Sequence, residues 1–400
     1  MEWSPKQQRA LDSVSRWIEN PGSQVFKLFG YAGTGKTTLA KHFAEQSPGR
    51  TLFAAFTGKA ALVLQEKGCY NASTIHRLIY IPKDKSASRL HDMQSELLES
   101  KDLDRQRELR KLIEEENENL KRPVFSLNFE SEIRDSKLVI IDEVSMVGRR
   151  MAEDLLSFRI PILVLGDTAQ LPPVADGGYF TKGEPDIMLD EIHRQAAGSP
   201  VIRMATKVRE GGDLSIGTEY HEDHEPSHVV NKGDLNIHAL ASFDQILVGR
   251  NATRKTVNRM LRKETLNRES HLPEEGDKLV CLRNNNDLGL MNGSLWNVVR
   301  CSEISDDAIG LTIEDPSWGS RIDTIAHRHH FEDREGDLDH WEKRERNEFD
   351  FGYALTVHKV QGSQWDKVVL IDESTCFRQD ARKWLYTGIT RASKSITVIR

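Results

Sequence analysis

Eight residues near the N-terminus have the types and spacing of a phosphate-binding loop. Residues Gly30–Thr37 read G-Y-A-G-T-G-K-T, which fits the pattern G-x-x-x-x-G-K-[ST]. The glycines of such a loop let backbone N–H groups converge on phosphate oxygens, and the next helix adds the positive end of its dipole. Lys36 is expected to reach the β- and γ-phosphates, and Thr37 to ligate Mg²⁺. The pattern predicts a protein that uses ATP or a similar nucleotide.

The elements around this loop are those that the motif requires. Val25–Phe29 is a β-rich apolar run, and Thr38–Ala44 has helical spacing. A strand, a glycine-rich loop and a helix in this order bring backbone N–H groups to the phosphates. The loop residues expected to contact the nucleotide are Gly30, Gly33, Thr34, Gly35, Lys36, Thr37 and Thr38.

A second apolar run ends in two carboxylates. Lys137–Glu143 reads K-L-V-I-I-D-E, which is typical of a buried parallel strand with its carboxyl end at the site. Asp142 is expected to hold Mg²⁺, and Glu143 to orient and deprotonate the attacking water.

A third run, Ile162–Asp167, leads into a turn that contains Gln170. A glutamine at a strand end can bond both a γ-phosphate and the water that attacks it. Alternatively, Pro172 and Pro173 merely end the strand in a turn. The residues of this segment alone leave both interpretations open.

Composition limits the class of protein. The chain has 400 residues, of which 29% are charged and 38% hydrophobic, with a formal net charge of −7. This length suits two to four compact units. The acidic balance disfavours a globally basic nucleic-acid binder, but it leaves room for a local basic groove. We expect a cytoplasmic enzyme without a membrane anchor, because no basic-plus-apolar leader or long apolar run is evident.

The order of motifs resembles superfamily 1 DNA helicases of the 5′-to-3′ branch, particularly the RecD-like and phage Dda-like enzymes. Besides the phosphate loop, the matching segments are Ser4–Gln8, Phe56–Ala61, Ala72–His76, Ile141–Met146, Gly166–Pro173, Leu189–Gln195, Tyr353–Ser363 and Leu385–Ala392. The resemblance implies that Gln7 reads adenine, and that Arg194 and Arg391 reach the γ-phosphate. A planar, permanently charged guanidinium suits the charge of a phosphoryl-transfer transition state. The implied catalytic residues are Lys36, Glu143, Gln170, Arg194 and Arg391.

The same resemblance implies a set of strand-contacting residues. The expected DNA-binding residues are Thr57, Lys59, Thr74, His76, Phe125, Phe129, Thr356 and His358. Neutral hydroxyls and backbone N–H groups suit a motor, because a grip that is released in every cycle cannot depend on many tight ion pairs. One departure is Gln364, where many relatives carry an acidic residue.

The predicted fold is α/β, with two RecA-like parallel-sheet P-loop NTPase cores, a pin and helical insertion, and an SH3-like β-barrel insertion. We expect the first core at 1–188, interrupted by 83–134, and the second core at 189–274 and 349–400. The short alternating strands and Asn/Gly turns of 275–348 predict the barrel.

The insertion in the first core carries two further predictions. Lys83–Arg122 is strongly charged with leucines at helical spacing, and it forms either a solvated ornament or a functional helical hairpin. Pro123–Phe129 alternates like a short β arm. Phe125 and Phe129 either pack the insertion onto the core or form the pin that splits duplex in the family.

The residues alone predict an ATPase coupled to nucleic acid, and the resemblance implies an ATP-dependent DNA helicase that moves 5′ to 3′ on single-stranded DNA and separates duplex. The expected ligands are ATP and Mg²⁺, and the expected partners are single-stranded and forked DNA, with single-strand-binding or replication proteins as candidates and a monomer as the assembly. One alternative is a single-strand-stimulated translocase that does not unwind. Another is a P-loop small-molecule kinase, which would not need the second core with Arg391.

Overall fold

The phosphate loop follows β1, which lies fifth in the spatial order of a six-stranded parallel sheet. The computed structural model describes residues 3–47, 49–82, 125–172, 178–192, 194–285, 288–316, 319–334 and 346–400, together with short pieces between 93 and 113 and residue 336. The first sheet has the order β3 (Ser73–Thr74), β2 (Thr51–Ala55), β6 (Leu138–Asp142), β7 (Ile162–Gly166), β1 (Val25–Gly30) and β8 (Ile187–Leu189). Its inner strands are apolar throughout because both faces are covered, as expected of a parallel sheet.

Helices flank this sheet. They are α1 (Pro5–Glu19), α2 (Lys36–Gln46), α3 (Gly58–Glu66), α4 (Ile75–Ile79) and α7 (Arg149–Ser157), with short 3₁₀ turns at η1 (Glu132–Asp135) and η2 (Val144–Met146). Ser4 caps α1: its hydroxyl accepts the N–H of Gln7, and the Gln7 side chain accepts the N–H of Ser4. The apolar face of α1 packs into the same core as β1 and α2.

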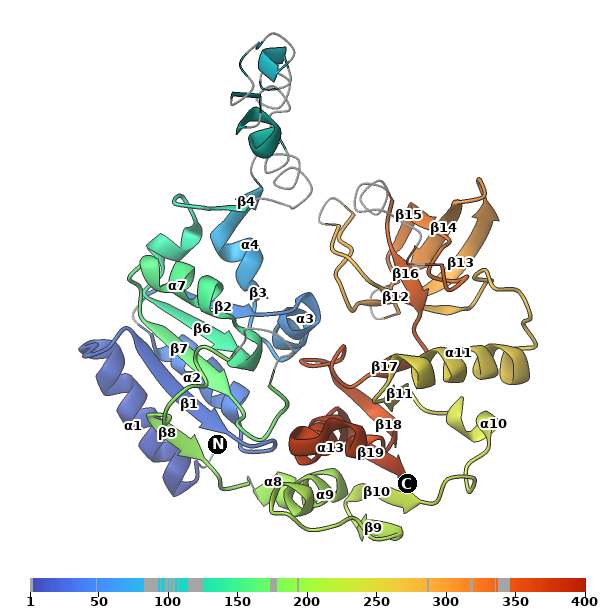
Figure 1. Ribbon diagram of the computed structural model, residues 1–400. Helices are drawn as coiled ribbons and strands as arrows, with labels where there is room; N and C mark the ends of the chain where they lie inside the picture. The colour runs from blue at the N-terminus through green and yellow to red at the C-terminus, as the bar shows by residue number, and fades with distance from the viewer. Residues whose placement is uncertain are drawn as a thin grey trace.

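A second six-stranded sheet lies beside the first (Figure 1). Its order is β17 (Ala354–Thr356), β11 (Gln245–Val248), β18 (Trp365–Ile371), β19 (Ala392–Ile399), β10 (His224–Val230) and β9 (Gly217–His221). All neighbours are parallel except β10 and β9. The accompanying helices are α8 (Arg194–Ala197), α9 (Pro200–Arg209), α10 (Ile237–Leu240), α11 (Asn251–Leu266), η3 (Ser374–Asp380) and α13 (Ala381–Ile389).

The stretch predicted as a barrel supplies four strands of a five-stranded antiparallel sheet, seen at the upper right in Figure 1. Its order is β15 (Arg321–His327), β14 (Ala308–Glu314), β13 (Leu295–Glu303), β12 (Lys278–Cys281) and β16 (Phe349–Phe351). Because β16 pairs with β12, the residues that we assigned to the second core from 349 onward begin in this sheet. Similarly, Leu189 pairs with Gly30, one residue past the predicted end of the first core.

A small two-stranded sheet stands at the base of the charged insertion. Strand β4 (Tyr80–Pro82) pairs in antiparallel fashion with β5 (Phe125–Leu127). The predicted arm at Pro123–Phe129 therefore contains a strand, but its partner precedes the insertion. Most of Lys83–Arg122 lies outside the described residues, so its helical prediction stays a prediction.

Candidate nucleotide site and strand-contacting surface

A cavity of about 280 Å³ opens between the two parallel sheets, above the phosphate loop. The first-sheet side contributes Tyr31, Ala32, Gly33, Gly35, Lys36, Thr37, Thr38, Asp142, Glu143 and Gln170. The second-sheet side contributes Gly362, Ser363, Gln364, Thr390 and Arg391. The predicted site residues at the ends of β1, β6 and β7 thus meet, because the carboxyl ends of parallel strands share one edge of the sheet.

The loop has the backbone that a phosphate cradle needs. Gly35 lies at φ 83° and precedes α2, so the chain enters the helix from a left-handed conformation that favours glycine. A side chain at Gly30 would lie 2.6 Å from the Thr34 hydroxyl. Lys36 Nζ donates to the carbonyl oxygens of Gly30 (2.7 Å) and Tyr31 (3.0 Å). The ammonium therefore already lies across the loop, where phosphate oxygens would replace the carbonyls.

Gln7 contacts the phosphate loop and the start of α1. Its Nε2 donates to the Thr34 carbonyl at 3.1 Å, and its Oε1 accepts the Ser4 N–H at 3.0 Å. The side chain is only 3% exposed and does not line the cavity. In this structure Gln7 braces the phosphate loop from α1, and its second Nε2 hydrogen and the second lone pair of Oε1 stay available to an adenine.

The two carboxylates after β6 lie in different surroundings. Asp142 Oδ1 accepts the N–H of Glu143 at 2.8 Å, and Glu143 adopts a left-handed backbone at φ 53°. This conformation is uncommon outside glycine and is often found at functional sites. Burial raises the pKa of Glu143, with Asp142 adding to the shift and Arg391 opposing it. A raised pKa suits a proton acceptor, because it increases basicity.

The surroundings of Gln170 favour a contact with the γ-phosphate and the attacking water over a purely structural role in a turn. Its side chain is 8% exposed and lines the cavity. Its Oε1 has no hydrogen-bond partner among the described residues. A buried amide oxygen without a partner is costly, so a ligand in the cavity that donates a hydrogen bond would be favoured.

Arg391 enters the cavity from the second sheet, immediately before β19. It is 4% exposed, and Nε, Nη1 and Nη2 bond Thr387 O, Ser363 O and Thr390 Oγ1 at 3.1–3.2 Å. These bonds hold the guanidinium in place before any nucleotide arrives. Arg194 is the first residue of α8, and its side chain lies outside the described residues.

Three predicted DNA-contacting threonines occupy similar positions: Thr74 and Thr356 end β3 and β17, and Thr57 follows β2 closely. Thr57 Oγ1 and Thr74 Oγ1 cap α3 and α4 by accepting the N–H groups of Ala60 and Arg77, both at 3.1 Å. Thr356 Oγ1 accepts the N–H of Lys359 at 3.4 Å. Since each hydroxyl accepts one bond, its own hydrogen stays available to a phosphate oxygen.

The turn around Thr57 faces the second half of the molecule. A side chain at Gly362 would lie 2.9 Å from Ala60 Cβ and 3.3 Å from Thr57 Oγ1. A side chain at Gly58 would meet Met291, in the loop that precedes β13. Lys59 is the second residue of α3, and burial lowers the pKa of Lys278, with the charge of Lys59 adding to the shift. The turn around Thr57 therefore lies beside the turn after β17 and the loop before β13.

Both predicted histidines are held by aromatic rings. His76 lies against Tyr80, with ring centroids 4.7 Å apart, and His358 lies against Phe377 at 5.2 Å. Burial lowers the pKa of each imidazole. Both rings are thus neutral at pH 7, in keeping with a grip that does not rely on ion pairs.

Phe129 follows the small β4–β5 sheet and is 67% exposed. This exposure excludes the alternative in which Phe129 packs the insertion onto the core. The side chain of Phe125 lies outside the described residues, although its backbone pairs with Pro82.

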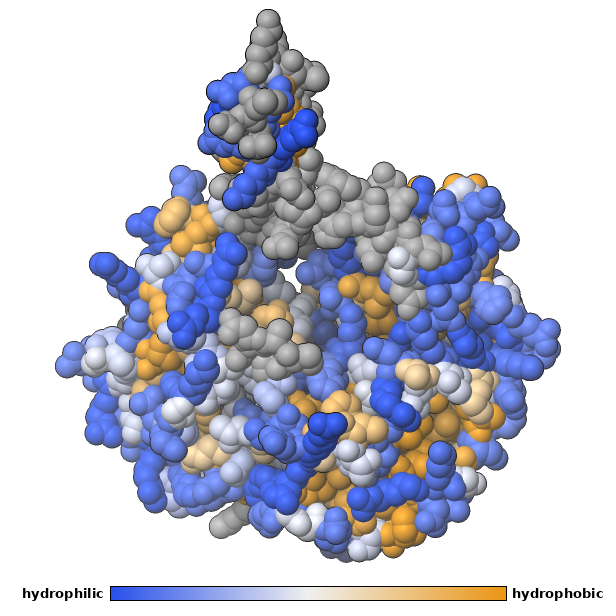
Figure 2. All heavy atoms as spheres, viewed as in Figure 1, coloured by the Kyte–Doolittle hydropathy of each residue, from blue (hydrophilic) through white to orange (hydrophobic). Residues whose placement is uncertain are grey.

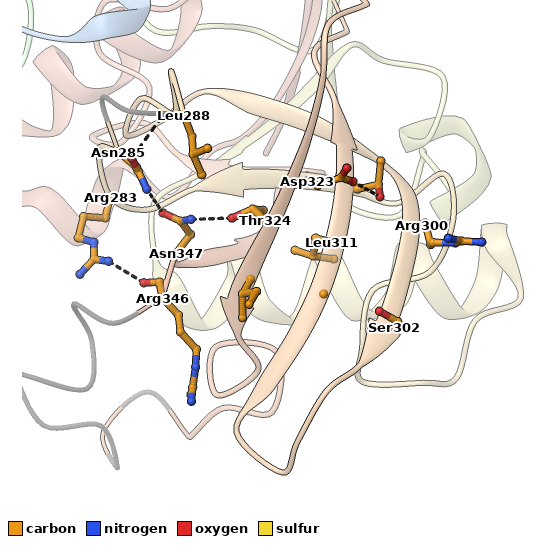
Figure 3. A pocket seen from close by; sticks show the side chains of 13 residues that line it. Arg283, Asn285, Leu288, Arg300, Ser302, Leu311, Asp323, Thr324, Arg346 and Asn347 are labelled. Atoms are coloured by element: carbon orange, nitrogen blue, oxygen red, sulfur yellow. Dashed lines mark hydrogen bonds between the residues drawn. The ribbon is translucent and has the colours of Figure 1, made fainter.

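A second, larger cavity of about 700 Å³ lies on the antiparallel sheet (Figure 3). Its polar side chains mainly bond one another: Asn285 donates to Asn347, Asn347 donates to Thr324, and Thr312 donates to Asp323. Among the described residues that line it, none belongs to a phosphate loop or to a pair of carboxylates. Its size alone therefore does not make it the nucleotide site.

Sequence comparison assigns the fold that this geometry suggests. A family model described as an AAA domain matches residues 2–231, more than half of the chain. The chain belongs to this AAA domain family. A model of the UvrD-like helicase C-terminal domain matches residues 351–399, which include β17–β19 and Arg391. These two matches, with the RecD2 and Pif1 helicases below, bear out the resemblance to superfamily 1 helicases.

The AAA-family relatives are longer than this chain. The ATP-dependent RecD2 DNA helicase of Deinococcus radiodurans is 27% identical over 97% of this chain and 48% of that protein. The ATP-dependent DNA helicase Pif1 of a Psychrobacter species is 25% identical over 78% of this chain and 49% of that protein. The chain thus spans about half the length of these curated relatives.

Solved structures show the same fold. Bacteroides Pif1 bound to single-stranded DNA aligns with a TM-score of 0.52, at 17% identity over 99% of this chain and 92% of that one. A structure of two coordinating Pif1 helicases at forked duplex DNA aligns with a TM-score of 0.53 at 16% identity, with the same coverage. The α/β fold with parallel-sheet cores is therefore similar to that of Pif1 helicases.

Cross-sheet contacts are the functional feature that the sequence did not reveal. Tyr386 on α13 and Gln361 after β17 bond the loops of the first sheet. Both lie in segments that matched the helicase motifs, but nothing in their spacing distinguished them from core residues.

None of the helices in the described part of the chain has the length and apolar character needed to cross a bilayer.

Proposed function

We propose that this chain is an ATP-dependent DNA helicase that moves 5′ to 3′ on single-stranded DNA. The observation that carries the proposal is the shared cavity, where the phosphate loop of one sheet meets the buried Arg391 of the other. An arginine supplied from a second sheet makes hydrolysis depend on how the two halves close. The curated relatives are ATP-dependent DNA helicases, which supports DNA as the polymer; the polarity rests on the family alone.

The proposed roles follow from the geometry of the cavity. Lys36 and the N–H groups of the loop bind the β- and γ-phosphates, and Glu143 takes the proton of the attacking water. Gln170 orients that water through its unpartnered oxygen. Arg391, with Arg194, stabilises the charge of the transition state.

Mg²⁺ fits the residues at the bottom of the cavity. Thr37 and Asp142 both line it and offer the oxygen ligands that this ion prefers. Mg²⁺ supplies charge neutralisation at the β- and γ-phosphates when it is bound. Thr37 would hold it through its hydroxyl and Asp142 through its carboxylate.

We propose that a DNA strand binds along the carboxyl ends of β2, β3 and β17 and the turns that follow them. The hydroxyls of Thr57, Thr74 and Thr356 would donate to phosphates, with Lys59, His76 and His358 beside them. Figure 2 shows a hollow between the first-sheet half and the antiparallel-sheet half, on a face where hydrophilic side chains predominate. A strand in such a hollow would touch all three sheets.

The finer organisation is part of the same proposal. We infer two RecA-like cores, with the five-stranded antiparallel sheet as an SH3-like barrel and the β4–β5 arm as the pin, at about the boundaries predicted from the sequence. Forked DNA as a partner, single-strand-binding or replication proteins, a monomeric state and a cytoplasmic location remain predictions.

The rate of ATP hydrolysis with and without a single-stranded oligonucleotide tests the proposal. We expect a large stimulation that Lys36→Ala abolishes by weakening nucleotide binding. A rate indifferent to the oligonucleotide would exclude both a helicase and a translocase, and would favour the kinase alternative. Duplexes with a 5′ or a 3′ single-stranded tail then separate unwinding from translocation and give the polarity.

A further inference from the structure

The phenol of Tyr386, in the half of the second sheet, bonds the phosphate loop. The N–H of Ala32 donates to the Tyr386 oxygen at 2.9 Å, and the Tyr386 hydroxyl donates to Asp167 Oδ2 at 2.7 Å. Tyr386 lies on α13, which packs on the second sheet, whereas Asp167 follows β7 of the first. One oxygen atom therefore joins the phosphate loop, the end of β7 and α13.

Two further bonds hold the turn that carries Gln170. The N–H of Leu171 donates to Thr387 Oγ1 at 2.8 Å, and Gln361 Nε2 donates to the Leu171 carbonyl at 2.9 Å. Leu171 is 2% exposed and packs in the hydrophobic cluster of the second sheet, together with Tyr386. The turn from Asp167 to Leu171 starts in the first sheet but is anchored in the second.

These contacts are buried, so they cannot be exchanged for water at little cost. Tyr386 is 2% exposed and Asp167 is 4% exposed. Burial raises the pKa of the Tyr386 phenol far above its ordinary range, and Asp167 adds to the shift, so the hydroxyl is a permanent donor. A buried carboxylate or amide that loses its hydrogen-bond partner destabilises the folded state. Movement of α13 must therefore carry Ala32 and Asp167 with it or break both bonds.

We propose that Tyr386 is a positioning residue that transmits movement of the second sheet to the phosphate loop and to Gln170. Tyr386 is five residues before Arg391, on the helix that leads to it. Gln361 follows Thr356 and bonds Leu171, in the turn that carries Gln170. A DNA strand that binds at Thr356 would therefore act on that turn through Gln361 and Leu171. This inference rests on the proposed function, and it explains how polymer binding on one side can change turnover in the cavity.

Tyr386→Phe tests this role because it removes the hydroxyl and keeps the buried ring. We expect the DNA-stimulated kcat for ATP hydrolysis to fall about tenfold, as for loss of one oriented contact in the transition state, with KM for ATP changed less than about twofold. Thr387→Val, which removes the acceptor of the Leu171 N–H, should lower kcat in the same direction. Both variants are compared at a temperature well below their measured Tm.

Tyr353 provides a matched control within the same chain. Its phenol donates to buried Asp277 at 2.7 Å and accepts the N–H of Lys278 at 3.2 Å, at the base of the antiparallel sheet. Tyr353→Phe removes the same kind of contacts away from the cavity. We expect a loss of stability like that of Tyr386→Phe, with kcat within about twofold of wild type.

The outcomes separate the two proposals. Wild-type kcat in Tyr386→Phe, or an equal fall in Tyr386→Phe and Tyr353→Phe, would overturn the positioning role. A rise in KM without a fall in kcat would also overturn it, because the phenol would then serve only nucleotide binding. A wild-type chain whose turnover ignores DNA would instead contradict the proposed function itself.

Discussion

At the scale of single residues, neighbouring carboxylates have different proposed tasks. Asp142 is the proposed ligand of a cation, whereas Glu143 has a pKa raised by burial and a left-handed backbone. We expect Glu143→Gln to bind ATP and DNA nearly as well as wild type but to lose about 100-fold or more in kcat, because the amide keeps the shape without the base. Nucleotide binding and single-turnover hydrolysis measure the two effects separately. Wild-type kcat in this variant would assign the base elsewhere.

Arg391 illustrates why positive charge alone is not enough to stabilise the transition state of ATP hydrolysis. All three of its guanidinium nitrogens are bonded to the surrounding turns, so its position is fixed by a planar fork. We expect Arg391→Lys to lower DNA-stimulated kcat by about 100-fold or more while ATP still binds, since arginine fingers contribute several powers of ten in rate. Steady-state kinetics and equilibrium binding test this. An unchanged stimulated rate would leave Arg194 as the acting arginine.

At the scale of elements, a glycine permits the turn after β17 to approach α3. Gly362 has φ 79°, and a methyl group there would meet Ala60 and Thr57. We expect Gly362→Ala to lower both stability and DNA-stimulated hydrolysis. Gly319→Ala is the control, because Gly319 has φ 65° but nothing within 4 Å. Gly319→Ala should lower the free energy of unfolding by about 1–2 kcal/mol through the same backbone strain and leave ATP hydrolysis unchanged. Equal effects on hydrolysis would mean that strain alone is responsible.

The β4–β5 arm should matter for duplex opening and not for turnover. Separating strands disrupts stacking worth about 1.4 kcal/mol per base-pair step, which requires a rigid obstacle at the fork. We expect Phe125→Ala with Phe129→Ala to leave single-strand-stimulated ATPase largely intact and to reduce unwinding sharply. Tyr70→Ala, an aromatic that is 80% exposed elsewhere on the first half, serves as the control. Proportional loss of both activities, or undiminished unwinding, would contradict a pin at this arm.

At the scale of the whole molecule, the proposed function predicts that the shared cavity and the cross-sheet bonds couple two ligands. If closure around ATP and closure around a DNA strand use the same pair of sheets, binding of each ligand should favour binding of the other. Linkage requires that DNA tighten ATP binding by the same factor by which ATP tightens DNA binding, which we expect to be about 5- to 150-fold. Binding titrations with a non-hydrolysable ATP analogue and a single-stranded oligonucleotide measure both factors. No coupling in either direction would mean that closure is not shared.

The sequence by itself determined the parts of this protein that depend on local spacing. The loop Gly30–Thr37, the carboxylates after β6 and Gln170 after β7 were all predicted, and they meet in one cavity. They could be predicted because a phosphate loop is a property of eight consecutive residues, and because parallel strands bring their carboxyl ends to one edge. The motif order also identified the family.

The tertiary structure decided which side chains meet across the two sheets. Tyr386 and Ala32 are 354 residues apart, and no local pattern indicates that their polar groups bond. The same holds for the bond between Gln7 and Thr34, and for β16, which joins the antiparallel sheet although it precedes β17 directly. Such contacts depend on how large apolar surfaces dock, and docking fixes the partner of a buried polar group only once both faces are folded.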